Sequence, residues 1–504
     1  MSAATSDNTG RLKFLKGRWI EGWDPENEEQ WEREGSKIAR RNLGFSVYAE
    51  FLGFVVWALW AITVPRLGKY GIVLTDSEQF TLISTPALVG ATLRFPYTYM
   101  VAKIGGRNWT IVSASLLLIP TTAMAWAISN QASFHTLWLV AALAGFGGGN
   151  FASSMANITF FFPQKTKGWA LGLNAAGGNI GSAIAQFTVP ILVTVTVVGG
   201  AAAVTAGDAK ENLPIAGWFW VPFILLAIGG AIWGMNNLTS AKNDLGGIKA
   251  SMRDPHQWIL SFLYIGTFGS FIGLGAAFPK LLSDQFPESD HITIAGATVV
   301  LAFLGPLVGS LIRPVGGRLA DRFGGAYITV LAFVVMIVAI FTAIQILESA
   351  SKADEKTGHF WPFLLCFMVL FTATGAGNGS MYKMIPTVFH FKAGVTNALT
   401  HSSGVSTERK IAATLGIVSA FGAYGGWMVP EIFKKAIEQT KVMEQKVVEG
   451  VPQLTPDGDP LMVNMNLVGG YQRGMWWLLT AYVVFLVVLI AAYVIPYARR
   501  GTRV

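Results

Sequence analysis

The sequence predicts an all-α membrane protein in which twelve transmembrane helices form two pseudo-symmetric six-helix bundles. Three observations predict this fold: the composition, the number of long apolar segments, and a set of motifs that occurs once in each half. Of the 504 residues, 52% are hydrophobic and 13% charged, and the mean hydropathy is +0.48. A soluble chain carries about 25% charged residues, so most of this chain is expected to lie in lipid.

Twelve apolar segments are near twenty residues or longer, enough to cross about 30 Å of hydrocarbon. We expect the spans near residues 44–65, 79–101, 109–128, 136–161, 168–197, 215–236, 257–280, 292–316, 325–347, 361–389, 410–430 and 474–496. The expected domains are a cytoplasmic segment 1–42, a bundle 43–236, a cytoplasmic linker 237–256, a second bundle 257–497 and a cytoplasmic tail 498–504.

Lysine and arginine counts in the loops give the orientation. With both termini in the cytoplasm, that side collects 23 of the 37 basic residues and the opposite side 11. The net charge of +8 then needs no nucleic-acid partner. Residues 1–42 lack the apolar core of a cleaved signal peptide, so the first span is expected to direct insertion. The charged run 21–41 is expected to be a solvated amphipathic segment at the membrane surface.

An arginine lies inside an apolar span in each half, within a repeated segment. LRFPYTYMVAKIGG runs from Leu93 to Gly106, and IRPVGGRLADRFGG from Ile312 to Gly325. A single offset of 219 residues pairs four positions: Arg94 with Arg313, Lys103 with Arg322, Gly105 with Gly324 and Gly106 with Gly325. The offset predicts that the two arginines occupy equivalent places in two related bundles.

The two arginines are expected to hold an anion. An arginine in mid-membrane costs about 2.5 to 3.5 kcal/mol on insertion scales, so two of them require a reason. The alternative is a buried ion pair for each, but of 29 acidic residues only Glu50 falls inside a span. Arg94 lies about 13 Å, at 1.5 Å per residue, from the span end at Lys103 and thus near the midplane. A planar guanidinium suits a planar oxyanion.

Glycine-rich motifs also occur in pairs. GGGN at 147–150 corresponds to GAGN at 375–378, and GLNAAGGNIG at 172–181 more loosely to GIVSAFGAYGG at 416–426. Glycines four residues apart let membrane helices pack closely, and packing alone explains most such pairs. Their density in two equivalent stretches also fits helices that slide or bend. The candidate conformational glycines are Gly172, Gly177, Gly178, Gly181, Gly422, Gly425 and Gly426.

The chain offers no sign of an enzyme, and we expect neither a cofactor nor a metal. The single cysteine, Cys366, excludes a disulfide framework and a cysteine-based metal site. All six histidines lie in loops or at span ends. The glycines 145–149 lie within a span with no strand before them, which excludes a dinucleotide fingerprint.

At these motifs the sequence resembles a known family. GRLADRFGG at 317–325 is similar to the signature loop of the major facilitator superfamily. Arg94, Arg313, GGGNFASSMANITFFFP, GLNAAGGNIG and FGAYGG resemble the NarK-type nitrate/nitrite porters. The resemblance implies a monomeric bacterial inner-membrane transporter that works by alternating access, whose partners are the nitrate and nitrite anions and the lipid bilayer. The implied substrate-binding residues are Arg94, Arg313, Asn179, Tyr264, Phe268, Phe151 and Gly416.

Some features keep a second interpretation. Tyr264 and Phe268 are one turn apart and share a face, which fits packing as well as a ligand cage. Lys383 either lines the cavity or extends to the cytoplasmic surface. In the first half, Thr98 and Ala102 stand where the second has Gly317 and Asp321, and the external segment 431–473 has no assigned role.

The expected mechanism is exchange of nitrate for nitrite. Proton coupling generally needs an Asp, Glu or His that titrates within the membrane, and two arginines cannot serve. The alternatives are a proton-coupled nitrate symporter that uses Glu50 or Lys383, an organic-phosphate antiporter, and an anion channel.

Overall fold

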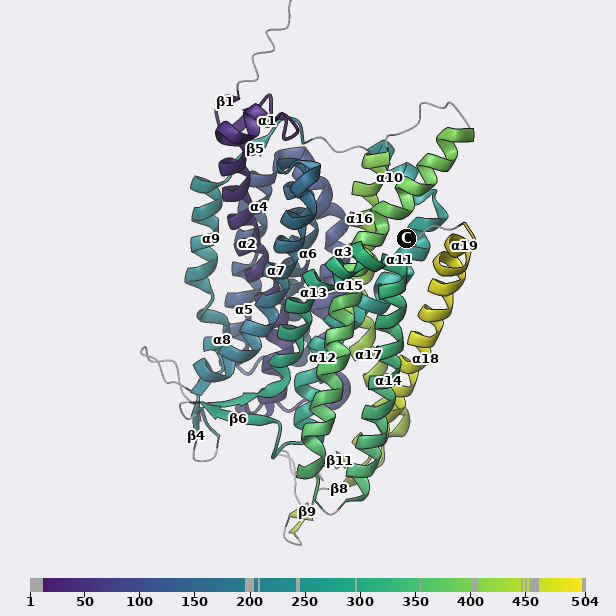
Figure 1. Cartoon of the computed structure of the whole chain (residues 1–504). Helices are drawn as coiled ribbons and strands as arrows, with labels where there is room; N and C mark the ends of the chain where they lie inside the picture. Colours follow the sequence, from purple (N-terminus) through teal and green to yellow (C-terminus); the bar gives the residue numbers. More distant parts are fainter. Residues whose placement is uncertain are drawn as a thin grey trace, which may run out of the picture.

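The computed structural model describes residues 12–194, 204–206, 209–241, 245–294, 297–353, 355–399, 407–445, 447–448, 451–452 and 462–500. Its long helices run side by side in two bundles (Figure 1). Twelve helical segments occupy the places of the twelve predicted spans. They are α2 (Ser36–Thr63), α3 (Asp76–Ile104), α4 and α5 (Gly106–Leu116, Leu118–Ser129), α6 (Phe134–Phe161), α7 (Gln164–Thr194), α8 and α9 (Ile215–Trp218, Val221–Gly234), α11, η3 and α12 (Pro255–Tyr264, Ile265–Gly269, Ser270–Gln285), α13 (Leu304–Phe323), α14 (Gly325–Lys352), α15 (Thr357–Leu399), α16 and α17 (Thr407–Ala423, Gly425–Thr440), and α18, η5 and α19 (Leu467–Leu489, Ile490–Val494, Ile495–Ala498).

The helices that carry the arginines are the more polar ones. Within the described residues, nine of the segments are long and apolar enough to span a bilayer by length and composition alone. The other three are α3, α13 and the pair α16 and α17, which carry Arg94, Arg313 and the second glycine-rich stretch. The more polar helices therefore lie where the two halves face each other rather than where they would face lipid.

The repeated glycines end equivalent helices. Gly105 follows α3 and Gly324 follows α13, with φ of 91° and 97° respectively. These positive φ angles favour glycine over residues with a Cβ atom. The pairing of Gly105 with Gly324 in the sequence thus reflects the same turn at the end of both helices.

The eighth span begins later than predicted. Residues 292–303 were expected to be part of the helix, but His291–Ile294 (β6) and Ala297–Val300 (β7) form an antiparallel hairpin, and Leu301–Phe303 (η4) leads into α13 at Leu304. Both strands are rich in β-branched residues, which favour extended backbone. Hydropathy alone cannot separate such a short apolar strand from the start of a helix.

The N-terminal segment is docked on the first bundle through its strands, while the charged side chains of the run 21–41 are exposed or partly exposed, in line with the solvated run predicted there. Strand β1 (Lys13–Leu15) pairs with β2 (Trp19–Glu21), which pairs in parallel with β5 (Asn237–Leu238). Ile20 and Trp23 are buried. Helix α1 (Glu28–Gln30) and the π-helical turn η1 (Trp31–Gly35) continue directly into α2. Residues 1–11 and 501–504 of the predicted cytoplasmic ends lie outside the described residues.

The linker is divided between the bundles. Its first part, β5, pairs with the N-terminal strand β2. Its second part, α10 (Leu245–Met252), lies against the second bundle, where the Ser251 and Thr414 hydroxyls are 2.8 Å apart. Just beyond it, Lys392 Nζ lies 2.6 Å from Asp254 Oδ2. Both described ends of the chain lie at this end of the bundles (Figure 1).

At the opposite end, a buried lysine joins the two halves. Lys280 Nζ of α12 lies 3.0 Å from Asp76 Oδ1 of α3 and 2.9 Å from Asp284 Oδ2. The Lys280 side chain is 3% exposed. Tyr471 of α18 donates a 2.6 Å hydrogen bond to the same Asp284 carboxylate. The ion pair between Asp76 and Lys280 therefore links the first bundle to a fixed group in the second.

Helix α17 adds three contacts with α3 beside this ion pair. Ser77, Thr81 and Ser84 hydrogen-bond Glu438 at 2.6 Å, Lys434 at 2.9 Å and Glu431 at 2.8 Å, respectively. The first part of segment 431–473 is thus a helix that closes this end. The short strands at the same end are β3 (Val204–Ala206), β4 (Ala209–Glu211), β8 (Met443–Gln445), β9 (Val447–Val448), β10 (Val451–Pro452) and β11 (Met462–Asn464) (Figure 1).

Candidate anion-binding site

Arg94 lies at the centre of the molecule, between the two bundles. It is fully buried on α3. Its Nε donates to Gly148 O of α6 at 3.1 Å, and its Nη1 donates to Ser419 O of α16 at 2.7 Å. Both bonds are to neutral carbonyls, so they orient the guanidinium without neutralising its charge.

Arg313 enters the same region from the second bundle. It is 5% exposed on α13, and its Nη2 donates to the Tyr264 hydroxyl at 3.0 Å. Tyr264 is the last residue of α11, and the π-helical turn η3 follows it. Such turns within α-helices are frequent at functional sites. Tyr264 and Phe268 stack with ring centroids 5.2 Å apart, as expected from their shared face.

Two phenyl rings lie beside both guanidinium groups. Phe151 of α6 and Phe268 stack with centroids 5.8 Å apart, one from each bundle. Arg94 Cζ is 4.6 Å from the Phe151 centroid and 5.2 Å from that of Phe268. Arg313 Cζ is 5.9 Å and 5.6 Å from the same two centroids. Both guanidinium groups thus lie beside the same pair of rings.

Several buried polar atoms at this level have no hydrogen-bond partner within the part of the chain that the structure describes. They include Arg94 Nη2, Arg313 Nη1, Thr267 Oγ1 and both amide atoms of Asn179. Buried polar groups are normally paired, because each unpaired group costs about 1–3 kcal/mol. An anion would satisfy the arginine N–H groups, the Thr267 hydroxyl and the Asn179 amide N–H, but not the Asn179 oxygen, which is itself an acceptor.

The buried carboxylate of Glu50 does not pair with the arginines in the described part of the chain. It is 0% exposed on α2 and accepts hydrogen bonds from Ser154 and, at 2.6 Å, from Asn174 Nδ2. Lys383 is not in the cavity either, because its Nζ lies 2.6 Å from Asp321 Oδ1 and its side chain is 53% exposed. The positive charge of the arginines thus stays uncompensated by an ion pair.

Asn179 and Gly416 make no hydrogen bond to either arginine among the described contacts. Asn179 is 1% exposed on α7. Gly416 lies one turn before Ser419, whose carbonyl binds Arg94, and a Cβ atom at Gly416 would meet only Thr98, at 3.7 Å. The structure therefore brings Arg94, Arg313, Tyr264, Phe268 and Phe151 into one cluster, and it shows no contact of Asn179 or Gly416 with these five side chains within the described residues.

Three residues of the cluster were not predicted. The Tyr382 ring of α15 lies 5.1 Å from Arg313 Cζ and 5.5 Å from the Tyr264 ring. It follows Asn378 of the GAGN motif by four residues, a helical spacing that could have revealed it. Ser419 contributes a carbonyl, which side-chain chemistry does not reveal. Trp57, with its ring 5.9 Å from Arg94 Cζ, has no distinguishing sequence signal.

Most of the candidate conformational glycines pack helices within one bundle, and Gly426 also packs against Ala87 of α3 in the other bundle. Cβ atoms at Gly177, Gly178 and Gly181 would clash with Val47, Glu50 and Phe51 of α2. Those at Gly422, Gly425 and Gly426 would clash with Tyr264, Gly269 and Ile272. Gly172 differs, because a Cβ atom there would meet nothing within 4 Å. Six of the seven therefore occupy close helix contacts, which fits both packing and sliding.

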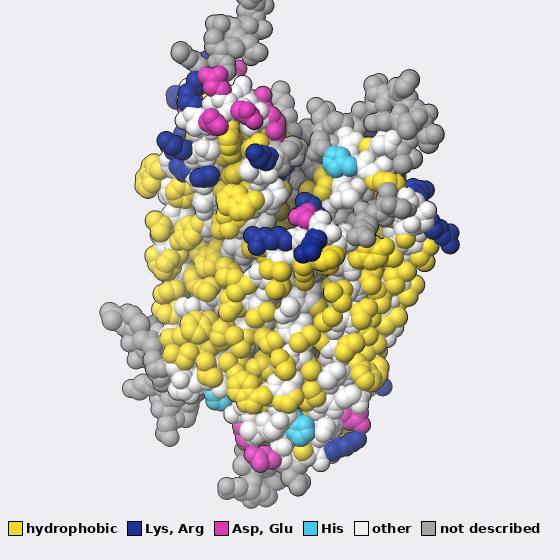
Figure 2. Space-filling model, viewed as in Figure 1, with side chains coloured by type: hydrophobic (Ala, Val, Ile, Leu, Met, Phe, Trp, Pro, Cys, Tyr) yellow, Lys and Arg dark blue, Asp and Glu magenta, His cyan; other side chains and the backbone are white. Residues whose placement is uncertain are grey.

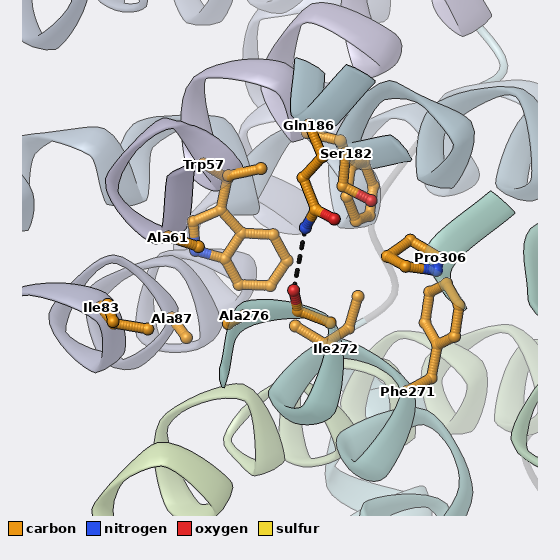
Figure 3. Close-up of a pocket in the computed structure, with 13 residues that line it drawn as sticks. Trp57, Ala61, Ile83, Ala87, Ser182, Gln186, Phe271, Ile272, Ala276 and Pro306 are labelled. Atoms are coloured by element: carbon orange, nitrogen blue, oxygen red, sulfur yellow. Dashed lines mark hydrogen bonds between the residues drawn. The ribbon is translucent and has the colours of Figure 1, made fainter. Parts of the chain in front are cut away.

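An apolar cavity lies between the arginines and the end closed by Lys280. Its lining includes Trp57, Ala87 and Ile272, so both bundles contribute to it. Figure 3 shows Gln186 of α7 reaching across to α12, where its Nε2 donates to Gly275 O at 2.9 Å. Phe271 lines the cavity and stacks on Phe268 at 6.4 Å. Aromatic rings thus separate this cavity from the guanidinium groups.

The chain is similar over most of its length to known membrane transporters. The model of the Major Facilitator Superfamily matches residues 49–426. The nitrate/nitrite transporter NarU of Salmonella typhimurium is 38% identical over 86% of this chain and 93% of that protein. The probable nitrate/nitrite antiporter NarK2 of Thermus thermophilus is 33% identical over 83% and 89%, respectively.

A solved structure agrees with the fold. A bacterial homologue of the human lysosomal transporter Spinster, in an inward-facing and occupied conformation, matches with a TM-score of 0.57 over 89% of this chain and 94% of that chain. The two sequences are 18% identical, so this similarity shows the fold alone.

Proposed function

Because this chain belongs to the major facilitator superfamily and, within it, to the NarK-type nitrate/nitrite porters, we propose that it carries nitrate and nitrite across the bacterial inner membrane. It works as a monomer by alternating access, with both termini in the cytoplasm. The anion binds between Arg94 and Arg313, and nitrate enters in exchange for nitrite.

The single observation that carries this proposal is the placing of two uncompensated guanidinium groups beside the same two phenyl rings. Arg94 Nη2 and Arg313 Nη1 are buried and without a partner among the described residues. A planar oxyanion accepts such N–H groups in its own plane. Phe151 and Phe268 stack beside both guanidinium groups, and the Tyr264 hydroxyl accepts a hydrogen bond from Arg313.

The contacts between the bundles support an inward-facing assignment. Four α3 residues bind the second bundle at the end opposite the termini, which the orientation rule makes external. At the end that holds the described termini, the surface is indented between the bundles (Figure 2). The bundles are therefore joined by charged and polar contacts at the external end, and the outward-facing state requires the Asp76 and Lys280 ion pair to separate.

Exchange follows from the charge of the empty site. Two facing arginines repel one another in a medium of low dielectric constant, which opposes closure around an empty cavity. A bound anion removes this repulsion in either direction of transport. Only the loaded carrier then reorients readily, so import of one anion is tied to export of another.

Proton-coupled nitrate symport is the second candidate, and Glu50 is the observation that favours it. A carboxyl buried in the membrane is a typical proton carrier. Its two partners, Ser154 and Asn174, are neutral. Exchange is preferred because the hydrogen bonds of Glu50 in the described chain come from Ser154 and Asn174 and not from either arginine. An organic-phosphate antiporter or a channel has no comparable support.

Reconstitution into liposomes tests the proposal. Liposomes loaded with nitrite should take up isotopically labelled nitrate, while empty liposomes should take up little. Labelled nitrate that enters empty liposomes as fast as loaded ones would contradict exchange. Flux that shows no counterflow and no saturation would indicate a channel instead.

A further inference from the structure

A group of cationic side chains lines an open hollow where the N-terminal hairpin meets the first bundle. The hollow has a volume of about 700 Å³ and its lining includes Arg18, Lys37 and Arg41. A fourth cation, Arg107, stands next to it and donates to Gly17 O at 3.5 Å. Nothing in the transport mechanism uses these residues.

The arginines are held in place by the end of the first bundle. Arg18 Nε donates to Met235 O at 2.8 Å, and Arg41 Nη2 donates to Asn236 Oδ1 at 2.7 Å. Arg18 has a φ of 59°, a left-handed conformation that residues with a Cβ atom seldom adopt. Each bond is to a neutral acceptor, so both groups keep their charge and further N–H donors. The cluster is thus fixed before any ligand arrives.

No carboxylate neutralises this group in the described part of the chain. The one acidic residue of the lining is Glu34, and its carboxylate lies 3.3 Å from Arg33 Nη2 instead. Lys37 and Arg41 are one turn apart at the start of α2 and therefore face the same way. The hollow is consequently a site of concentrated positive charge that suits a phosphate group.

The rim of the hollow is apolar. Phe14 and Leu15 also line it and are 55% and 38% exposed. Trp233, in the last turn of α9, is 76% exposed, and tryptophan is typical of the interface between lipid and water. In Figure 2, basic side chains gather on this bundle directly above the broad hydrophobic band. The cluster therefore lies at headgroup level.

We propose that this hollow binds the headgroup phosphate of an anionic phospholipid in the cytoplasmic leaflet. Arg18, Lys37 and Arg41 contact the phosphate, and Phe14 and Leu15 contact the acyl region. The apolar rim favours a lipid over a soluble phosphate, which would gain nothing from it. The assignment is independent of nitrate binding, because none of these residues touches the arginine cluster.

Native mass spectrometry of the purified full chain tests the proposal. Protein from nanodiscs of mixed phosphatidylglycerol and phosphatidylcholine should retain phosphatidylglycerol about tenfold in preference. The double variant Lys37→Gln/Arg41→Gln should lose this preference. The control Lys13→Gln/Lys103→Gln removes the same charge from exposed positions outside the hollow, and it should behave as wild type. If the control variant loses the preference for phosphatidylglycerol equally, the lipid is held only by general electrostatic attraction, and the proposed site is wrong.

Two further measurements separate the outcomes. If millimolar inorganic phosphate displaces the retained lipid, the hollow is a site for free phosphate, and the assignment to a phospholipid is wrong. The variant Phe14→Ser/Leu15→Ser should reduce lipid retention severalfold, and unchanged retention would contradict the role of the rim. Nitrate binding by each variant, measured in parallel, shows whether it has folded.

Discussion

Arg94 and Arg313 come from opposite bundles, 219 residues apart in the chain, yet both guanidinium carbons lie within 6 Å of the Phe268 ring centroid, at 5.2 and 5.6 Å. An aromatic face attracts a cation through its quadrupole. One ring therefore helps to hold two like charges close together. This arrangement is the basis of the first two predictions.

Replacing Arg94 or Arg313 by lysine should weaken nitrate binding at least tenfold in isothermal titration calorimetry. Lysine keeps the charge but lacks the planar fork of N–H groups, and a charge-assisted hydrogen bond contributes about 1.5–3 kcal/mol. Arg322→Lys makes the same chemical change at an exposed position of α13 and should bind as wild type. Wild-type affinity in either buried variant would exclude the shared site.

Nitrite and chlorate should compete with labelled nitrate, whereas glycerol phosphate should not. Tyr264, Phe268 and Phe151 are all fully buried beside the arginines, so we expect the site to admit an anion with three oxygens and to exclude a larger one. Competition assays at matched concentrations measure this directly. If the phosphate ester competes as well as nitrite does, the substrate class is wrong.

Gly177→Leu should slow exchange far more than it weakens nitrate binding. A side chain there would press on Val47 of α2, away from the arginines. Gly172→Leu is the control, because a Cβ atom at that position meets open space. Gly422→Leu should reduce binding as well as exchange, since its side chain would displace Tyr264. If Gly177→Leu loses folded protein and exchange activity to the same extent, helix packing is the only role of Gly177.

Asp76→Asn should favour the outward-facing state. The change removes the charge that joins α3 to Lys280 but leaves Asp284 and Tyr471 in place. The readout is alkylation of Ala87→Cys, in the cavity below this closure, on a Cys366→Ser background. Labelling from the external side should rise severalfold. Asp321→Asn, which breaks the ion pair with Lys383 at the other end, should produce no such rise.

The rate of nitrate/nitrite exchange should not depend on an imposed pH gradient. Uptake of labelled nitrate into nitrite-loaded liposomes should be the same with and without an acid exterior, and Glu50→Gln should preserve it. Glutamine retains the shape of the side chain and can still accept the hydrogen bonds of Ser154 and Asn174. Rapid uptake into empty liposomes that depends on external acid and is lost in Glu50→Gln would replace exchange by proton symport.

Local patterns predicted the twelve helical segments and the two arginines of the central cluster. The two arginines stand out because a charge within an apolar span is rare, and the offset of 219 residues shows that they are equivalent. Tyr264, Phe268 and Phe151 came from family resemblance, since aromatic residues are common in every span. Tyr382 was not predicted for the same reason.

Other features could not be predicted because they depend on residues far apart in the chain. The ion pair between Asp76 and Lys280 joins two charges at the predicted ends of different spans, where either is unremarkable alone. The pairing of β2 with β5 joins residues more than 200 positions apart. The late start of α13 reflects β-branched residues whose hydropathy is that of a helix.

The divided linker sets a mechanical limit on the transport cycle. Because β5 and Thr239 are bound to the first bundle and α10 to the second, only the six steps of chain from Thr239 to Leu245 connect them. Six steps of at most about 3.6 Å cover about 22 Å. At the cytoplasmic end, the distance to which the two bundles can separate is therefore limited by the length of this connection as well as by packing.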